Sequence, residues 1–122
     1  GRSKMGKALK GLSMKLVSKG SLVFVQDASG QDFLLKDFGT PIDVAFYSQS
    51  KGLILVVLNT DDQRIHCLNP SGAPLWIAQA IHPVEFVGFR ETEDKLFAIN
   101  GYGNVYAIDV RTGLLTLDHF EK

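Results

Sequence analysis

Residues 41–48 read Pro-Ile-Asp-Val-Ala-Phe-Tyr-Ser, and residues 83–90, which begin 42 positions later, read Pro-Val-Glu-Phe-Val-Gly-Phe-Arg. The two stretches agree in residue class at almost every position. The agreement continues downstream, where residues 65–69 match residues 105–109, and a partial third copy begins at residues 23–30. A repeat of this length that is filled with short apolar segments predicts similar β-sheet units stacked side by side.

Each copy divides into four short strands separated by turn residues. Pro41 opens the first strand of the middle copy, where a missing amide N–H is tolerated. Residues 53–58 form a continuous apolar run, which is typical of a strand buried on both faces. The predicted strands are 41–48, 53–59, 63–68 and 73–79 in the middle copy, and about 83–90, 95–100, 104–109 and 114–120 in the last. The first copy supplies only three, so about eleven strands are expected.

The turn between the third and fourth strands of each copy carries a motif. It is similar to the pattern Ala-x-Asp-x-x-Thr-Gly-x-x-x-Trp of the pyrroloquinoline-quinone-type repeat. The matching residues are Ala107, Asp109, Thr112 and Gly113 in the last copy, where Leu117 replaces the tryptophan, and Gly72 and Trp76 in the middle copy. The chain therefore resembles the β-propeller superfamily, and within it the quinoprotein-like blades. The Gly-His and Trp-Asp signatures of WD-repeat propellers are absent.

The resemblance implies an all-β fold with about three four-stranded antiparallel blades of a β-propeller, the first of them incomplete. The expected divisions are a basic N-terminal arm or cloning-linker remnant (1–11), partial blade 1 (12–40), blade 2 (41–82) and blade 3 (83–122). It also implies structural roles in the repeat, in turns or between blades, for Pro41, Pro83, Gly72, Trp76, Asp109, Thr112 and Gly113.

The strand count has a consequence for assembly. Closed propellers have about 4 to 8 blades, and an open arc leaves sheet edges and apolar faces uncovered. We therefore expect an open arc or part of a larger assembly, completed by a protein partner or by self-association. Two copies would supply about six blades.

Charge is unevenly distributed along the chain. The net charge is zero, but residues 1–19 contain six basic residues and no acidic ones, so the remainder carries 7 basic against 13 acidic residues. This argues against nucleic-acid binding except through residues 1–19. The longest apolar run, 53–58, is far shorter than the roughly 20 residues of a membrane span, so no membrane insertion is expected. The single cysteine, Cys67, favours a reducing compartment and hence the cytoplasm.

The sequence predicts no catalytic, cofactor or metal site, and hence no enzyme. His66 has no second ligand at a recognisable spacing. Turn formation explains the adjacent Asp61 and Asp62, and residues 101–103 lack the third glycine of a dinucleotide fingerprint.

Function is expected to lie in loops that rigid blades present to protein partners. The loops between second and third strands and between consecutive blades should share one rim. The candidate binding residues on this rim are Phe38, Asp61, Asp62, His82, Tyr102 and Asn104. Two alternatives are a fragment or subunit of a quinone-type oxidoreductase, and a lectin-like propeller in which Trp76 or Tyr102 stacks on sugars.

Overall fold

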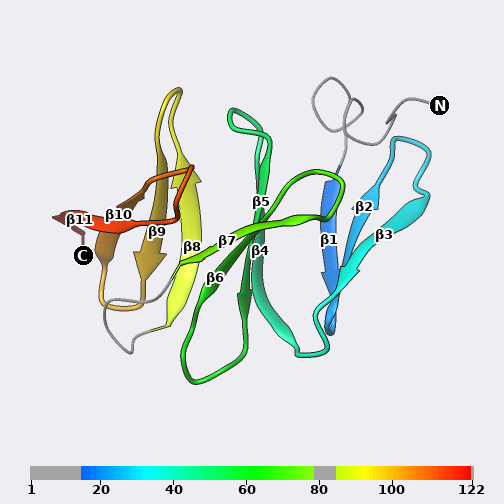
Figure 1. Ribbon diagram of the computed structural model, residues 1–122, viewed down its shortest axis with the longest axis horizontal. Helices are drawn as coiled ribbons and strands as arrows, with labels where there is room; N and C mark the ends of the chain where they lie inside the picture. Colours follow the sequence, from blue (N-terminus) through cyan, green and yellow to red (C-terminus); the bar gives the residue numbers. More distant parts are fainter. Residues whose placement is uncertain (1–14, 79–84, 122) are drawn as a thin grey trace.

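A computed structural model describes residues 15–78 and 85–121, and their regular structure is entirely β-strand. The strands form three antiparallel sheets, called blades 1 to 3 in chain order (Figure 1). Blade 1 contains β1 (Lys15–Lys19), β2 (Leu22–Gln26) and β3 (Asp32–Asp37). Blade 2 contains β4 (Ile42–Ser48), β5 (Leu53–Leu58), β6 (Ile65–Leu68) and β7 (Pro74–Ala78). Blade 3 contains β8 (Phe86–Glu91), β9 (Leu96–Asn100), β10 (Asn104–Ile108) and β11 (Leu115–Phe120).

The blades stand side by side in an open arc. Strand β4 contacts β1 on one side and β8 on the other, so these three strands line one border of the array. Blades 1 and 3 lie at opposite ends and do not meet (Figure 1). The expected fold class is therefore confirmed: three antiparallel sheets, the first with only three strands in the described part of the chain.

Strand β5 is buried on both faces, as its apolar run predicts. Alternate residues of a strand point to opposite faces. Ile54, Val56 and Leu58 pack in the core between blades 1 and 2. Leu55 and Val57 pack in the core between blades 2 and 3. Blade 2 thus contributes to both hydrophobic cores.

The hydrogen-bond register corrects the alignment of the repeats. The sequence match places Val44 opposite Phe86 in the repeat, 42 residues apart. In the structure Ile42 pairs with Leu58 and Phe86 pairs with Asn100, so Phe86 is the counterpart of Ile42, 44 residues away (86 − 42). The spacing between copies is therefore not uniform, because turns and linkers differ in length. A spacing of 42 still holds between β5 and β9, where Leu58 corresponds to Asn100.

Candidate interaction rim

Trp76 joins blade 2 to blade 3. It pairs with Cys67 across β6 and β7, and its indole Nε1 donates a hydrogen bond to the carbonyl oxygen of Val110, 2.9 Å away. Gly113 lies against the ring: a Cβ atom at this position would clash with Cε3 of Trp76. The side chain is half-buried. Because its ring is packed on the turn of blade 3, Trp76 serves as a joint between blades and does not present a free stacking surface.

The sequence pattern places Leu117 of blade 3 at the position of Trp76, but the structure places Thr116 there. Thr116 pairs with Ala107, whereas Leu117 pairs with Tyr106. The turn before β11 is one residue longer than the turn before β7, and a shift of one residue moves a side chain to the other face of a sheet. Thr116 therefore occupies the place of Trp76, and Leu117 points to the opposite face.

The turns that precede β3, β7 and β11 share one mechanism. The side-chain oxygens of Asp27, Asn69 and Asp109 each accept a hydrogen bond from the backbone N–H two residues further on, with distances of 2.9 to 3.0 Å. This is the Asx-turn geometry. In blade 3, Thr112 Oγ1 also accepts from the N–H of Leu114. A glycine at φ between 82° and 92° completes each turn: Gly30, Gly72 or Gly113.

A second joint, which the repeat pattern does not reveal, is built around Glu91. Its carboxylate accepts hydrogen bonds from the hydroxyls of Ser48 (2.7 Å) and Ser50 (2.8 Å) and from the N–H of Gln49 (3.1 Å). Burial acts to raise the pKa of Glu91, but these hydrogen bonds outweigh it and hold the pKa below its ordinary value. These hydrogen bonds connect the β4–β5 turn of blade 2 to the end of β8 in blade 3.

The rim loops lie together, at the lower edge of Figure 1. They include the β1–β2, β5–β6 and β9–β10 turns and the β3–β4 connection. Asp61 and Asp62 are exposed at the tip of the β5–β6 turn, and Tyr102 is 70% exposed in the β9–β10 turn. Asp62 forms an ion pair with Arg64 at 3.1 Å, and all three side chains are accessible to solvent.

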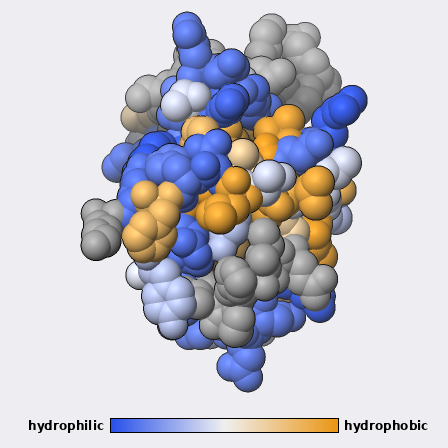
Figure 2. Space-filling view, turned by 90° about the vertical axis from the view of Figure 1, so that its left-hand side faces the viewer, coloured by the Kyte–Doolittle hydropathy of each residue, from blue (hydrophilic) through white to orange (hydrophobic). Residues whose placement is uncertain are grey.

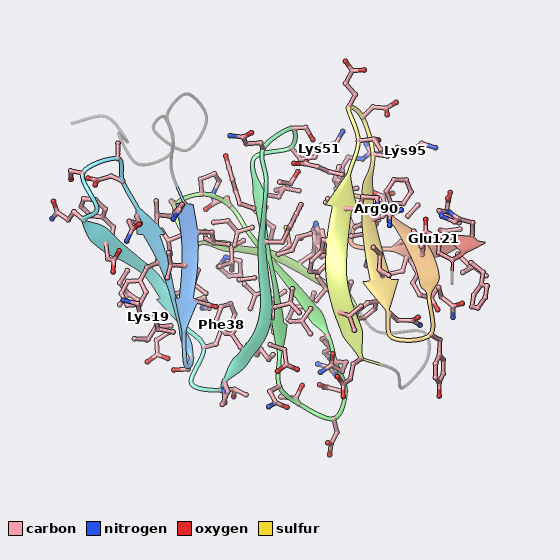
Figure 3. The ribbon with its side chains drawn as sticks, turned by 180° about the vertical axis from the view of Figure 1, so that it is seen from behind. Lys19, Phe38, Lys51, Arg90, Lys95 and Glu121 are labelled. Atoms are coloured by element: carbon pink, nitrogen blue, oxygen red, sulfur yellow. The ribbon has the colours of Figure 1, made fainter. Side chains whose placement is uncertain are left out.

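The other predicted rim residues are placed differently. Phe38 is half-buried and makes an edge contact with His66 at 5.5 Å between ring centroids; Figure 3 shows it at the foot of blade 1. Asn104 is half-buried and donates a hydrogen bond to the hydroxyl of Tyr106. Phe38 and Asn104 therefore pack against other residues of the chain and are less accessible to a partner than Asp61, Asp62 and Tyr102. His82 and Pro83 lie outside the described residues.

Gln63 is the rim residue that sequence reasoning missed. It is 5% exposed and has a positive φ of 42°. Its Nε2 donates to the carbonyl oxygen of Leu58, and its Oε1 accepts from the N–H of Phe86. Gln63 thus ties the β5–β6 turn to the start of β8. No local pattern distinguishes it from an ordinary polar turn residue.

The rim is acidic. Its exposed or half-exposed carboxylates, which lie in the loops or at adjoining strand ends, are Asp37, Asp43, Asp61, Asp62 and Glu85. The pKa of Asp62 lies below its ordinary value, chiefly because the hydroxyl of Thr60 donates a 2.6 Å hydrogen bond to it. Arg64, on the same turn, forms an ion pair with Asp62, and the rim still carries more carboxylates than basic groups beside the exposed Tyr102.

The pKa values of the two histidines in the described chain are shifted in opposite directions. Burial lowers the pKa of His66, whereas hydrogen bonds with Glu121 and Asp118 raise the pKa of His119. The stability from protonated His119 is present below its unfolded pKa of about 6.5 and is lost as pH rises through the higher folded value. The pKa of His66 is lower in the folded than in the unfolded state. As pH falls below the unfolded pKa, the unfolded chain therefore binds a proton first, and the folded state loses stability.

Proton NMR of the histidine rings should show this order, with the pKa of His119 above that of His66. His66→Gln and His119→Gln would assign the two resonances. The reverse order would contradict the environments described above.

Within residues 15–78 and 85–121, no group of three or more His, Cys, Asp or Glu side chains is arranged to hold a metal ion. The same residues contain no helix of the length and hydropathy needed to cross a membrane. Burial raises the pKa of the Cys67 thiol to about 12, so this cysteine is a packed apolar side chain in the core and not a reactive nucleophile.

Several solved structures are similar to this chain, and three of them are described. In the crystal structure of the Mitotic Checkpoint Complex, the matched chain gives a TM-score of 0.64 at 20% identity, over 81% of this chain and 32% of that one. BamB from Moraxella catarrhalis gives 0.60 at 13% identity, over 93% and 36%. BBS1N, in its complex with ARL6DN, gives 0.51 at 19% identity, over 88% and 36%.

These matched structures are β-propellers, so the three sheets are propeller blades. The chain spans about a third of the length of each matched chain. Comparison of the sequence with protein-family models gives no match, and neither does comparison with curated proteins.

Proposed function

We propose that this chain is a non-catalytic β-propeller segment that acts as an interaction scaffold and assembly module for proteins. The observation that carries the proposal is the rim, where loops from all three blades gather on one edge and expose Asp61, Asp62 and Tyr102. The two joints at Trp76 and Glu91 hold blades 2 and 3 in a fixed relation. Exposed loops that a rigid scaffold holds in place are a common site of protein binding.

Three further observations support this proposal. The matched chain of the Mitotic Checkpoint Complex and BBS1N with ARL6DN were both solved in protein complexes. The packing of Trp76 on Gly113 and Val110 further supports the finer proposal that blades 2 and 3 are of the quinoprotein-like type. The buried thiol of Cys67 is compatible with a reducing, cytoplasmic location.

The experiment compares capture of proteins from a cell extract by the wild-type chain and by Asp61→Lys/Tyr102→Ala. We expect the amount of the specific partner captured by the rim variant to fall about tenfold, since charge complementarity and exposed aromatic side chains contribute strongly at interfaces. Added salt should weaken capture by the wild type, because exposed charges are screened.

The matched control is Glu93→Lys/Leu75→Ala, which makes the same charge change and removes one exposed apolar side chain away from the rim. It should capture the partner as the wild type does. A partner held equally well by the rim variant would place the binding surface elsewhere, and the absence of any specific partner would count against the scaffold function.

A further inference from the structure

One asparagine of the chain has a reactive neighbour. The sequence contains four asparagines, and only Asn100 is followed by glycine. The backbone nitrogen of the following residue can attack an asparagine side chain, and glycine hinders this attack least because it has no Cβ atom. The other three asparagines are followed by a residue with a branched Cβ or by proline, which has no N–H. These pairs are Asn59–Thr60, Asn104–Val105 and Asn69–Pro70.

The reaction that this pair favours is deamidation, which consumes only water. The nitrogen of Gly101 bonds to Cγ of Asn100, and the displaced Nδ2 group takes up the amide proton and leaves as ammonia. Water then opens the resulting cyclic imide at either of its carbonyl carbons. Opening on one side gives aspartate. Opening on the other gives isoaspartate, in which the main chain runs through the former side chain and gains a methylene group.

The folded β9–β10 turn holds both reacting groups. The N–H of Gly101 donates a 2.9 Å hydrogen bond to the carbonyl oxygen of Glu85. Oδ1 of Asn100 accepts from the N–H groups of Tyr102 and Asn104, both at 3.0 Å, and Asn100 is only 3% exposed. The two donors polarise Cγ, but the nitrogen cannot attack while its proton is held by Glu85. The attack therefore requires these hydrogen bonds to break.

The acceptor of the Gly101 N–H is itself fixed from blade 2. Glu85 directly precedes β8, where the N–H of Phe86 donates to Oε1 of Gln63 at 3.2 Å. Gln63 is 5% exposed, and its Nε2 donates to the carbonyl oxygen of Leu58, also at 3.2 Å. Removal of the Gln63 side chain would free the start of β8 and, with it, the carbonyl group that holds Gly101.

Water lies close to the reactive pair. Gly101 and Tyr102 are exposed, and Figure 2 shows hydrophilic residues along the lower edge of the blade 3 side, where the β9–β10 turn lies. Turns at the edge of a domain open locally at a lower cost in free energy than core strands. Opening of this turn alone would expose Asn100 to water and release the N–H of Gly101.

We propose that Asn100–Gly101 is a deamidation site that the fold keeps closed, and that opening of the β9–β10 turn converts Asn100 to aspartate and isoaspartate. The rate in the folded chain is then set by the fraction of molecules in which the turn is open. Aspartate keeps the acceptor of the turn, as Asp27 and Asp109 do in theirs. Isoaspartate lengthens the main chain next to Tyr102, so it changes the rim.

Peptide mapping by mass spectrometry tests the proposal on the 122-residue chain. The chain is kept at mildly alkaline pH, either folded or unfolded in guanidinium chloride, and is then digested with trypsin. Cleavage after Lys95 and Arg111 gives one peptide that contains both Asn100 and Asn104. We expect Asn100 to convert at least about tenfold more slowly in the folded chain. Asn104 should stay unchanged in both samples over the same period.

Three variants separate the chemistry from the fold. Gly101→Ala adds a Cβ atom beside the nitrogen, so it should slow conversion in the unfolded chain at least about tenfold. Gln63→Ala frees the start of β8, so it should speed conversion in the folded chain at least about threefold. Thr92→Ala, an exposed control in the β8–β9 turn at the other end of β8, should leave the rate unchanged. Circular dichroism would show that each variant is folded.

The products are distinguished by hydrogen exchange of the Tyr102 and Asn104 amides. Asn100→Asp should keep their protection, because a carboxylate oxygen accepts the same two hydrogen bonds. The isolated isoaspartate form should lose it.

Three outcomes would overturn the proposal: equal rates in the folded and unfolded wild type, no conversion of Asn100 in the unfolded chain, or a folded Gln63→Ala that converts no faster than Thr92→Ala. These measurements involve no binding partner, so their failure leaves the scaffold function to be judged by capture alone.

Discussion

Replacing Trp76 with alanine should lower the free energy of unfolding by about 3 kcal/mol, the lower end of the range for large aromatic side chains because this ring is only half-buried. The variant loses the packing of the indole on Gly113 and the hydrogen bond to Val110. Urea denaturation followed by far-UV circular dichroism measures the change, since the variant has no other tryptophan to report by fluorescence.

Trp76→Phe is the matched control for this prediction. It keeps an aromatic ring but removes the N–H donor, so it should lose less than the alanine variant, with about 1 kcal/mol of the loss due to the hydrogen bond. A loss below about 1 kcal/mol for Trp76→Ala, which is typical of surface substitutions, would show that the ring does not join the blades.

Gly113→Ala should destabilise the chain by about 3 kcal/mol, for two separate reasons. Its φ of 82° is strained for any residue with a Cβ, and the new methyl group would clash with the Trp76 ring. Gly39→Ala separates the two effects, because φ is 70° there and no atom of the described residues lies within 4 Å of the new Cβ. The control should lose only the backbone component, so equal losses in both variants would argue against the steric contact.

The double variant Trp76→Ala/Gly113→Ala tests whether the two residues act on each other. Removal of the indole makes room for the alanine methyl group, so the combined loss should be smaller than the sum of the single losses. Coupled neighbours typically deviate from additivity by about 0.5 to 3 kcal/mol. Strict additivity would mean that the ring and the turn do not share a contact.

Much of the fold follows from the sequence because its signals are local. The apolar run of β5 predicts a strand buried on both faces, and Asp or Asn followed by Ser or Thr and Gly predicts the turns before β7 and β11. Both kinds of signal depend on residues that are close together in the chain. These are the features for which prediction and structure agree.

The joints between blades follow from the sequence only in part. The motif indicates Trp76, but Glu91 and Gln63 meet their partners across blades, 43 and 23 residues away in the chain. Pairing at such distances depends on the register of whole strands. The sequence match aligns Phe86 with Val44, but in the structure Phe86 corresponds to Ile42, two residues earlier. The same difficulty affects the rim, where Phe38 looks like a loop residue in the sequence but packs against His66.

The burial of β5 on both faces makes the three blades unequal. In an array whose units contact only their neighbours, stability is approximately the sum of the units and the couplings between them. Blade 1 and blade 3 each depend on a single coupling, whereas blade 2 cannot open without breaking both. Within the described residues, loss of structure should therefore begin in blades 1 and 3 and reach β5 last.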